Sequence, residues 1–408
     1  MYESEINGIN KKNRTPMAVI VYSSFPRDVR VRRETETLLG ANYKIDLFCL
    51  RRKGEGQLAR EKGENLNIYR SLPVGSRGFP LRYVLEYFYF TLATFLKVSF
   101  LFFRSRYKLV HVHNMPDFLV FAALIPKLFG AKILLDLHDP TPEVFMAKYN
   151  VDEKNIFIKV LILIEKISLG FADFIVTPNL AFKELFVARG CPASKIDIVM
   201  NVPMEKITDR YENTIHSKIQ PRPNPFVIMY HGTIVKRHGL LTALEAIHIL
   251  KDKISDLKFN VFGRGDFLPA FLNEIETQNL SGLVEYKGSV FNEKIFDYIN
   301  ECNLGVIPNL NTTFTNLNLP VRIFEYLALK KPVIVPKTKG ITDYFDQNSI
   351  NYFDAGDAES LAETILDVYE NSEKQNKIIE KGFEIYSKHK WSEEKNVLIR
   401  SANQLLEK

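Results

Sequence analysis

Cysteine is scarce in this chain, and the cysteines that occur do not form a metal or redox motif. Three are present in 408 residues, at Cys49, Cys191 and Cys302, and they stand far apart in the sequence. Zinc sites, redox pairs and disulfide frameworks all need cysteines at short, regular spacings. The sequence therefore argues against a zinc-stabilised or disulfide-stapled scaffold, and it favours a reducing compartment.

Several other signatures are missing. No Gly-x-x-x-x-Gly-Lys-Ser/Thr stretch is present, which disfavours a P-loop enzyme. No pairing of carboxylates like that of the glycosidases is evident. The formal net charge is +6, and no nucleic-acid recognition motif accompanies the basic residues, so we expect no nucleic-acid partner.

Long uncharged hydrophobic runs are also missing. The most apolar segment, Tyr83 to Phe103, is interrupted by Glu86 and Lys97, so no uncharged span reaches about 18 residues. On this count we expect no transmembrane helix. The start of the chain is polar and lacks an apolar signal region, and we expect residues 1–16 to form a loose tail.

The same region is strongly basic. Residues 51–108 contain twelve Lys and Arg against four Glu, which gives this stretch a charge of +8. One interpretation is a core helix with basic flanks. The other is an interfacial element on an anionic membrane, which predicts a peripheral protein of the cytoplasmic face that salt releases from vesicles. In that case the binding should weaken when Gln replaces four arginines, namely Arg77, Arg82, Arg104 and Arg106.

Short apolar strands alternate with helical patterns along most of the chain. Such alternation predicts parallel sheets that helices cover on both faces. The pattern pauses in a polar stretch before Phe226 and then restarts. We therefore predict an α/β fold class with two Rossmann-like, doubly wound domains facing a cleft. The predicted strands are Met17–Tyr22, Tyr43–Leu50, Leu109–His113, Lys132–Leu137, Phe174–Thr177, Phe226–Tyr230, Lys258–Phe262, Leu283–Lys287, Leu304–Ile307 and Val333–Val335.

The pause sets the predicted domain boundaries. Residues 17–205 are assigned to an N-terminal Rossmann-like domain, and residues 206–225 to a linker. Residues 226–385 are assigned to a C-terminal Rossmann-like domain. Residues 386–408 are expected to form a C-terminal helix that packs back on the N-terminal domain.

Ligands of doubly wound sheets bind beyond the carboxyl ends of the strands. In the N-terminal half, His138 follows a strand and stands between Asp136 and Asp139. Its imidazole can donate to a sugar hydroxyl or to a developing charge there, unless it is only satisfied within a strand-end turn. His111 and His113 alternate on a strand without a third ligand at metal spacing, so they are assigned structural or supporting roles.

The C-terminal half has two candidate binding segments. The loop from His231 to Gly239 combines glycines with basic residues, which suits a phosphate, although a charged strand-to-helix turn has the same composition. Glu325 lies in the short helix after Asn318–Pro320, where a lone carboxylate suits the vicinal hydroxyls of a ribose. The alternative is a surface Glu in a first helical turn. Gly263-Arg264-Gly265 is too short for a dinucleotide fingerprint.

Taken together, these motifs resemble glycosyltransferase family 4, the retaining enzymes whose two Rossmann-like domains form the GT-B fold. The resemblance covers about residues 17–390 and points to bacterial members that build surface polysaccharides or glycolipids. The motifs that carry it are Asp28–Glu34, Val112–Asn114, Asp136–Asp139, His231–Gly239 and Leu319–Tyr326.

The resemblance implies a hexosyltransferase that moves a sugar from a UDP- or GDP-sugar to a glycan or lipid-linked acceptor. It implies that the C-terminal half binds most of the donor and that the N-terminal half binds most of the acceptor. It implies no cofactor and no metal, because basic side chains and helix N-termini hold the diphosphate. The implied catalytic residues are His138, Arg237 and Arg322. The implied donor-binding residues are Gly232, Thr233, Lys236, His238, Gly239, Gly288, Val290, Asn318, Leu319, Pro320 and Glu325. The implied acceptor-side residues are Arg30, Arg33, Asn114 and Asp139.

The chain departs from the family pattern in two places. Leu317 stands eight positions before Glu325, where many members have a Glu that contacts the transferred sugar. Thr233 and His238 stand where many members have Arg and Lys. The candidates to supply the missing charge are Lys236, Arg237 and Arg322. Two other functions stay open: a nucleotide-sugar epimerase of the same architecture, and a non-catalytic partner at a membrane surface.

Overall fold

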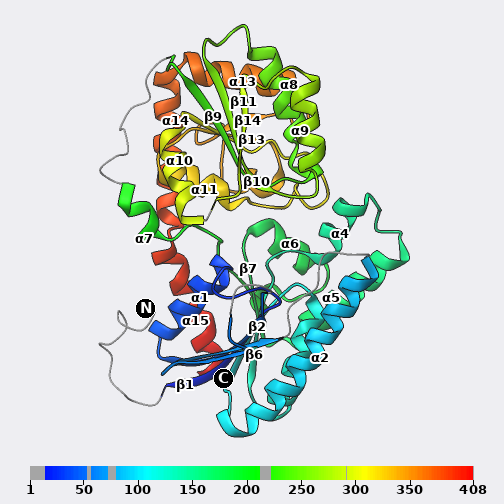
Figure 1. The fold of residues 1–408 in the computed structure, drawn as a ribbon. Helices are drawn as coiled ribbons and strands as arrows, with labels where there is room; N and C mark the ends of the chain where they lie inside the picture. The colour runs from blue at the N-terminus through cyan, green and yellow to red at the C-terminus, as the bar shows by residue number, and fades with distance from the viewer. Residues whose placement is uncertain (1–13, 53–56, 72–79, 212–221, 291, 408) are drawn as a thin grey trace. The chain divides into compact units, whose positions relative to one another are not determined.

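The computed structural model describes residues 14–52, 57–71, 80–211, 222–290 and 292–407, and the chain folds into two units (Figure 1). One unit contains residues up to Met146, Val151–Met200 and the residues from Glu394 on. The other contains Ala147–Asn150 and Asn201–Glu393. Most of the predicted tail and residues 212–221 of the predicted linker lie outside the described residues.

The first unit is built on an eight-stranded sheet with the strand order β3-β4-β2-β1-β5-β6-β7-β8. All neighbouring strands are parallel except β3 and β4, which are antiparallel. The strand order reverses between β1 and β5, so a ligand crevice is expected beyond the carboxyl ends of these two strands. The strands are β1 Thr15–Ile20, β2 Tyr43–Leu50, β3 Arg60–Lys62, β4 Leu66–Ser71, β5 Leu109–His113, β6 Lys132–Asp136, β7 Phe174–Thr177 and β8 Ile196–Ile198.

Helices cover this sheet. The helix α1 begins after Asp28, whose Oδ1 accepts a hydrogen bond from the Val31 amide at 3.2 Å and caps the helix. The C-terminal helix α15 contacts the sheet through Tyr43, whose hydroxyl donates to Asn403 Oδ1 across 2.7 Å. The helical segments up to residue 200 and at the C-terminus are α1 Val29–Gly40, α2 Pro80–Ser105, η1 Asp117–Ala123, α3 Leu124–Leu128, α4 Thr141–Tyr149, α5 Ile156–Phe171, α6 Leu180–Ala188, η2 Ala193–Lys195 and α15 Trp391–Glu407.

The second unit has a parallel six-stranded sheet with the order β11-β10-β9-β12-β13-β14. Its core lies between this sheet and α8, α9 and α13. The strands are β9 Phe226–Thr233, β10 Leu257–Arg264, β11 Val284–Gly288, β12 Leu304–Val306, β13 Val333–Pro336 and β14 Asn351–Phe353. The helical segments are α7 Glu205–Thr208, η3 Asp209–Tyr211, η4 Lys236–His238, α8 Leu240–Leu250, α9 Leu268–Thr277, η5 Asn292–Lys294, α10 Ile295–Glu301, α11 Val321–Ala328, α12 Lys339–Thr342, α13 Ala358–Glu370 and α14 Ser372–Lys388.

The ten predicted strands are confirmed, and both sheets are doubly wound as expected. Four strands were missed: β3, β4, β8 and β14. Three of these contain only three residues, and β4 mixes polar with apolar residues, so none has the continuous apolar run that marked the others.

The expectation of no membrane-spanning helix stays a prediction, and one helix of the first unit bears on it. Residues Val84–Ser105 of α2 form a helix that is long and apolar enough to cross a bilayer, judged by length and composition alone. Its three charged residues, Glu86, Lys97 and Arg104, leave the segment apolar on average. The interpretation of α2 as a core helix does not hold, because only 17% of this apolar segment is buried.

Candidate functional site

Three neighbouring strands of the second unit have a glycine at or one residue before their carboxyl ends. Gly263 pairs with Gly232, and Gly288 pairs with Phe262 after a register shift. All three glycines have positive φ, and a Cβ on Gly263 would lie 1.8 Å from the carbonyl oxygen of Gly232. Only glycine fits such a contact. We call Gly232, Gly263 and Gly288 the glycine edge, where the backbone can approach a ligand closely.

Glu325 lies beside this edge and is held by a histidine. Its Oε2 is 2.7 Å from Nε2 of His231, which is the residue before Gly232 on β9. Nδ1 of His231 lies 3.0 Å from the hydroxyl of Tyr326, and that hydroxyl donates to the carbonyl of Met229 at 2.9 Å. This chain of bonds fixes the Glu325 carboxylate and leaves its second oxygen able to accept from a ligand hydroxyl. Sequence reasoning did not assign His231 to the site.

Arg322 lies under the glycine edge. Its side chain is 8% exposed, its Nη1 donates to the carbonyl of His231 at 2.8 Å, and its guanidinium stacks over the ring of Tyr230 at 4.9 Å. A Cβ on Gly232 would be 3.2 Å from that same Nη1. The structure therefore brings a fixed positive charge to the carboxyl end of β9, where Arg322 also supports the strand.

The predicted phosphate loop presents its basic residues unequally. The side chain of Lys236 is exposed. Arg237 is half-buried over the ring of Phe314, and within the described part of the chain its Nε is buried without a hydrogen-bond acceptor. Gly239 has a φ of 65°, and a Cβ there would lie 1.8 Å from the carbonyl of Pro308, so this position also requires glycine. Lys236 and Arg237 are thus available to an anion.

His238 has a different role from the one predicted. Its Nδ1 donates to the carbonyl of Thr233 at 2.6 Å and lies 3.1 Å from the hydroxyl of Tyr230. Burial, together with the nearby charge of Arg322, lowers the pKa of His238 to about 3. A neutral imidazole that bonds within its own loop stabilises the loop, and it adds no charge for a phosphate.

The loop before α11 offers fewer amides than predicted. The amide of Asn318 already donates to the carbonyl of Phe314 at 3.0 Å, and Pro320 has no N–H. Leu319 is therefore the hydrogen-bond donor that remains in the predicted loop, followed by the first amides of α11.

The remaining predicted donor-site positions are partly accessible. Leu317 is half-buried in the loop before α11. Gly288 ends β11 and Val290 follows it, both half-buried, which places them one strand beyond β10.

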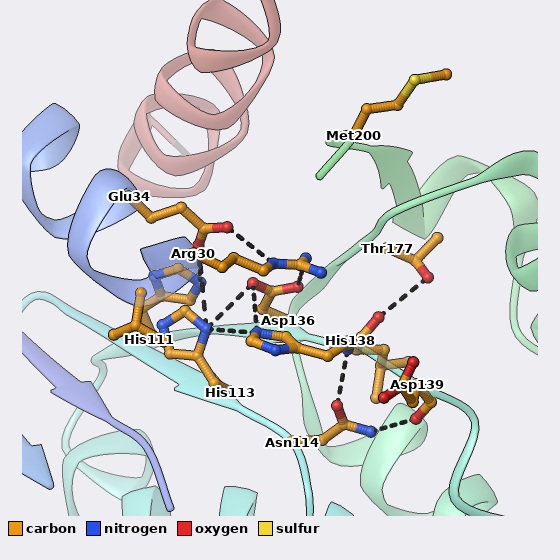
Figure 2. A network of polar contacts seen from close by, with 12 residues as sticks. Arg30, Glu34, His111, His113, Asn114, Asp136, His138, Asp139, Thr177 and Met200 are labelled. Atoms are coloured by element: carbon orange, nitrogen blue, oxygen red, sulfur yellow. Dashed lines mark hydrogen bonds and ion pairs between the residues drawn. The ribbon is translucent and has the colours of Figure 1, made fainter. Parts of the chain in front are cut away.

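The first unit holds a second polar cluster, shown in Figure 2. Asp136, at the end of β6, is fully buried and binds the guanidinium of Arg30 from α1. Its Oδ2 lies 3.1 Å from Nδ1 of His113 and 3.2 Å from Nε2 of His138. The two imidazoles also approach each other, with 2.9 Å between these nitrogens. The carboxylate thus sets the orientation of the His138 ring.

The charges of this cluster follow from burial and close partners. Burial opposes ionisation of Asp136, but Arg30 and the two histidines outweigh it and hold the pKa of Asp136 well below its usual value. Burial lowers the pKa of His138, and Arg30 lowers it further. The pKa of His113 is raised instead: burial lowers it, but Asp136 and Glu34 outweigh burial. His138 is therefore neutral near pH 7.

His138 and Asp139 form the wall of a small cavity. Asn114 holds this loop: its Oδ1 accepts from the His138 amide at 2.7 Å, and its Nδ2 donates to the Asp139 carbonyl at 2.7 Å. The cavity measures about 240 Å³ and is also lined by Asp28 and Tyr87. It lies beyond the ends of β1 and β5, where the strand order predicts a ligand.

Two predicted acceptor-side residues need reassignment. The side chains of Arg30 and Arg33 are 7% and 2% exposed, and neither lines the cavity. The guanidinium of Arg30 is engaged by Asp136 and, at 3.1 Å through its Nε, by Glu34. A buried guanidinium with two carboxylate partners cannot also reach an acceptor, so Arg30 supports the cluster below His138.

The same cluster has the spacing of a metal site. Ligand atoms of Glu34, His111, His113 and Asp136 all lie within 4.8 Å of one another. However, the guanidinium of Arg30 already occupies both carboxylates of this set. A divalent cation would add uncompensated buried charge beside the guanidinium. We interpret the cluster as a charge network that supports His138, and the prediction of no metal stays a prediction.

Comparison with known proteins identifies the class. The profile of the family "Glycosyl transferase 4-like domain" matches residues 28–201, and that of "Glycosyl transferases group 1" matches residues 212–385. The sucrose-phosphate synthase of Thermosynechococcus elongatus has the same fold, with a TM-score of 0.75 at 17% identity over 97% of this chain and all of that one. The chain therefore belongs to the glycosyltransferases of the GT-B fold, and this fold prediction is confirmed.

Two further proteins are similar to this chain. The amylovoran biosynthesis glycosyltransferase AmsK of Erwinia amylovora is 27% identical over 183 residues, which is 44% of this chain and 43% of AmsK. The match thus spans less than half the length of that curated relative. Anabaena HepE, solved in complex with UDP-glucose, gives a TM-score of 0.69 at 13% identity and covers 96% of this chain and all of its own. At this identity the likeness shows the fold alone.

Proposed function

We propose that this chain transfers a hexose from a UDP- or GDP-sugar to a glycan or lipid-linked acceptor during synthesis of a cell-surface polysaccharide, on the cytoplasmic side and with retention of the anomeric configuration. The observation that carries the proposal is Glu325, held by His231 at 2.7 Å beside the glycine edge. A fixed carboxylate can accept hydrogen bonds from the ribose hydroxyls. The backbone of the adjacent glycine edge can then approach the rest of the nucleotide closely.

The charges near this edge suit the leaving group. Transfer from a nucleotide sugar releases a diphosphate, whose negative charge grows in the transition state. Arg322 below Gly232, together with Lys236 and Arg237 in the adjacent loop, can stabilise that charge from fixed positions. Retention without an enzymic nucleophile requires this stabilisation while the acceptor attacks on the same face. No cofactor enters this scheme.

The comparisons support the choice of substrates. HepE, which shares this fold, was solved with UDP-glucose, so UDP-glucose is the first UDP-sugar to test as a donor. The name of AmsK refers to amylovoran biosynthesis, which favours a growing surface glycan as the acceptor. The cavity beside His138 is proposed to receive part of that acceptor.

Calorimetry with UDP, GDP and ADP, each with and without EDTA, tests the donor side. We expect one of the first two to bind, with an affinity that EDTA does not change. Incubation with UDP-glucose and a membrane extract should then release the diphosphate. If none of the nucleotides binds to the folded chain, the proposal is wrong.

A further inference from the structure

The helix α2 is apolar on two opposite faces. One stripe, Phe90, Thr94, Val98 and Phe102, recurs every four residues and is buried in the first unit. The other face is exposed and equally apolar, with Phe100 at 78% exposure. The residues on this exposed face include Leu85, Phe88, Leu92, Leu96, Phe100 and Phe103. A surface helix of a water-soluble protein normally turns a polar face to solvent, so this helix has a second apolar environment.

The helix α5 repeats this arrangement. It buries Ile158 and Leu169, whereas Ile156, Leu163 and Ile167 are exposed. Both α2 and α5 pack against the same element, η1, and in Figure 1 the two helices run along the same side of the first unit. Among the described residues, thirteen of the twenty exposed large hydrophobic side chains lie on these two helices. We call them together the α2/α5 surface.

Basic residues border the α2/α5 surface. Lys159 and Lys166 are exposed between its apolar residues on α5, and Arg104 is exposed at the end of α2. Acidic residues are few here: Glu86 is half-buried in α2, and two acids precede α5, Asp152 and Glu153. Beyond the end of α2, a cavity of about 310 Å³ is lined by both apolar and basic side chains, including Phe102, Arg106, Lys108, Phe129, Lys132 and Leu405.

The mixture of exposed apolar side chains and lysines on the α2/α5 surface favours a membrane over a second protein chain. An interface with a second copy would exclude lysine from its centre, because lysine is depleted in protein interfaces. Exposed aromatic and aliphatic side chains with lysines between them are typical of helices that lie in the surface of an anionic bilayer. The buried stripe of α2 holds the helix lengthwise against the first unit, so α2 does not need to cross the bilayer.

We infer that the α2/α5 surface inserts into one leaflet of an anionic membrane, and that apolar insertion, in addition to charge, holds the protein there. The inference does not depend on the proposed donor. It revises the expectation of salt-released binding, because salt screens the basic residues and leaves the apolar contribution in place. Two of the arginines in that expectation, Arg77 and the side chain of Arg82, lie outside the described residues.

Vesicle flotation of the full chain tests the inference. The vesicles contain phosphatidylcholine with or without phosphatidylglycerol, at low and at high salt. We expect the chain to float with the anionic vesicles and to stay largely bound at high salt. Leu96→Ser combined with Phe100→Ser should lower the bound fraction by about tenfold or more, because both side chains are exposed in water and would be buried in lipid. Lys159→Gln with Lys166→Gln should weaken binding at low salt only.

Leu272→Ser is the matched control, since Leu272 is exposed on the second unit and should not affect flotation. Nucleotide affinity, measured by calorimetry, should be the same in all variants, so a failure here is distinct from a failure of the proposed function. Absence of flotation at both salt concentrations would overturn the inference. A dimer in sedimentation velocity that the Leu96→Ser, Phe100→Ser variant converts to monomer would also overturn it, in favour of a second copy.

Discussion

His231 Nε2 lies 2.7 Å from Glu325 Oε2, although the two residues are 94 positions apart in the chain. This contact joins the carboxyl end of β9 to α11 beside the glycine edge. It orients the carboxylate before any ligand arrives, and preorganisation of this kind reduces the entropic cost of binding.

Replacing Glu325 tests this assignment. Glu325→Ala should weaken binding of the nucleotide by roughly 1–3 kcal/mol, because the ribose hydroxyls would lose their acceptor. Calorimetry measures the loss, and Glu363→Ala on the exposed face of α13 is the control. An unchanged affinity in a folded Glu325→Ala variant would remove Glu325 from the donor site.

The two arginines near the glycine edge should respond differently. Arg237→Ala should lower kcat strongly and leave the melting temperature close to that of the wild type, because this side chain is half-buried beside the loop. Arg322→Ala should lower both, since it also removes a hydrogen bond to the His231 carbonyl and a stack on Tyr230. Turnover assays and thermal melts measure the two effects, with Lys253→Ala as an exposed control. Normal turnover in both single variants and in the double variant would exclude the two arginines from the mechanism.

His138 is expected to act on the reaction more than on the fold. Its side chain is 20% exposed and lines the small cavity, so His138→Ala should remain folded, bind the donor and turn over slowly. Circular dichroism, calorimetry and turnover separate these effects, and His248→Ala on the exposed side of α8 is the control. If the His138 variant loses its fold, the residue is a structural part of the buried cluster.

His238 predicts a pH dependence of stability. Its pKa is lowered to about 3 in the fold, so between that value and its ordinary value near 6.5 the unfolded chain binds the proton more readily. Stability from this residue is therefore lost as the pH falls below about 6.5, by at most about 1.4 kcal/mol per pH unit. His238→Asn keeps an N–H for Thr233 but cannot titrate, and denaturant unfolding should show it losing less stability than the wild type between pH 6.5 and 4. An equal or greater loss in the variant would contradict the lowered pKa.

Much of the fold could be predicted from local sequence, for a physical reason. A strand such as Val333–Pro336 is buried on both faces, so it needs a continuous apolar run that is visible without a structure. Short strands such as Asn351–Phe353 have no such run, and only their pairing with a neighbour defines them.

The segments of the candidate site could also be predicted, because ligand-binding residues follow strands and strand ends can be recognised in the sequence; the roles of their residues stay predictions. By itself the sequence determined two doubly wound halves, a loop suited to phosphate and a lone carboxylate at Glu325. Only the tertiary structure decided which side chains meet. In the structure Glu325 contacts His231, His238 bonds within its own loop, and Arg30 is buried against Asp136. The first and last of these contacts join residues that lie far apart in the sequence, so only the folded chain brings them together. The tertiary structure also decided that α2 has one buried face and one exposed apolar face, since composition cannot tell which side of a uniformly apolar helix packs on the protein.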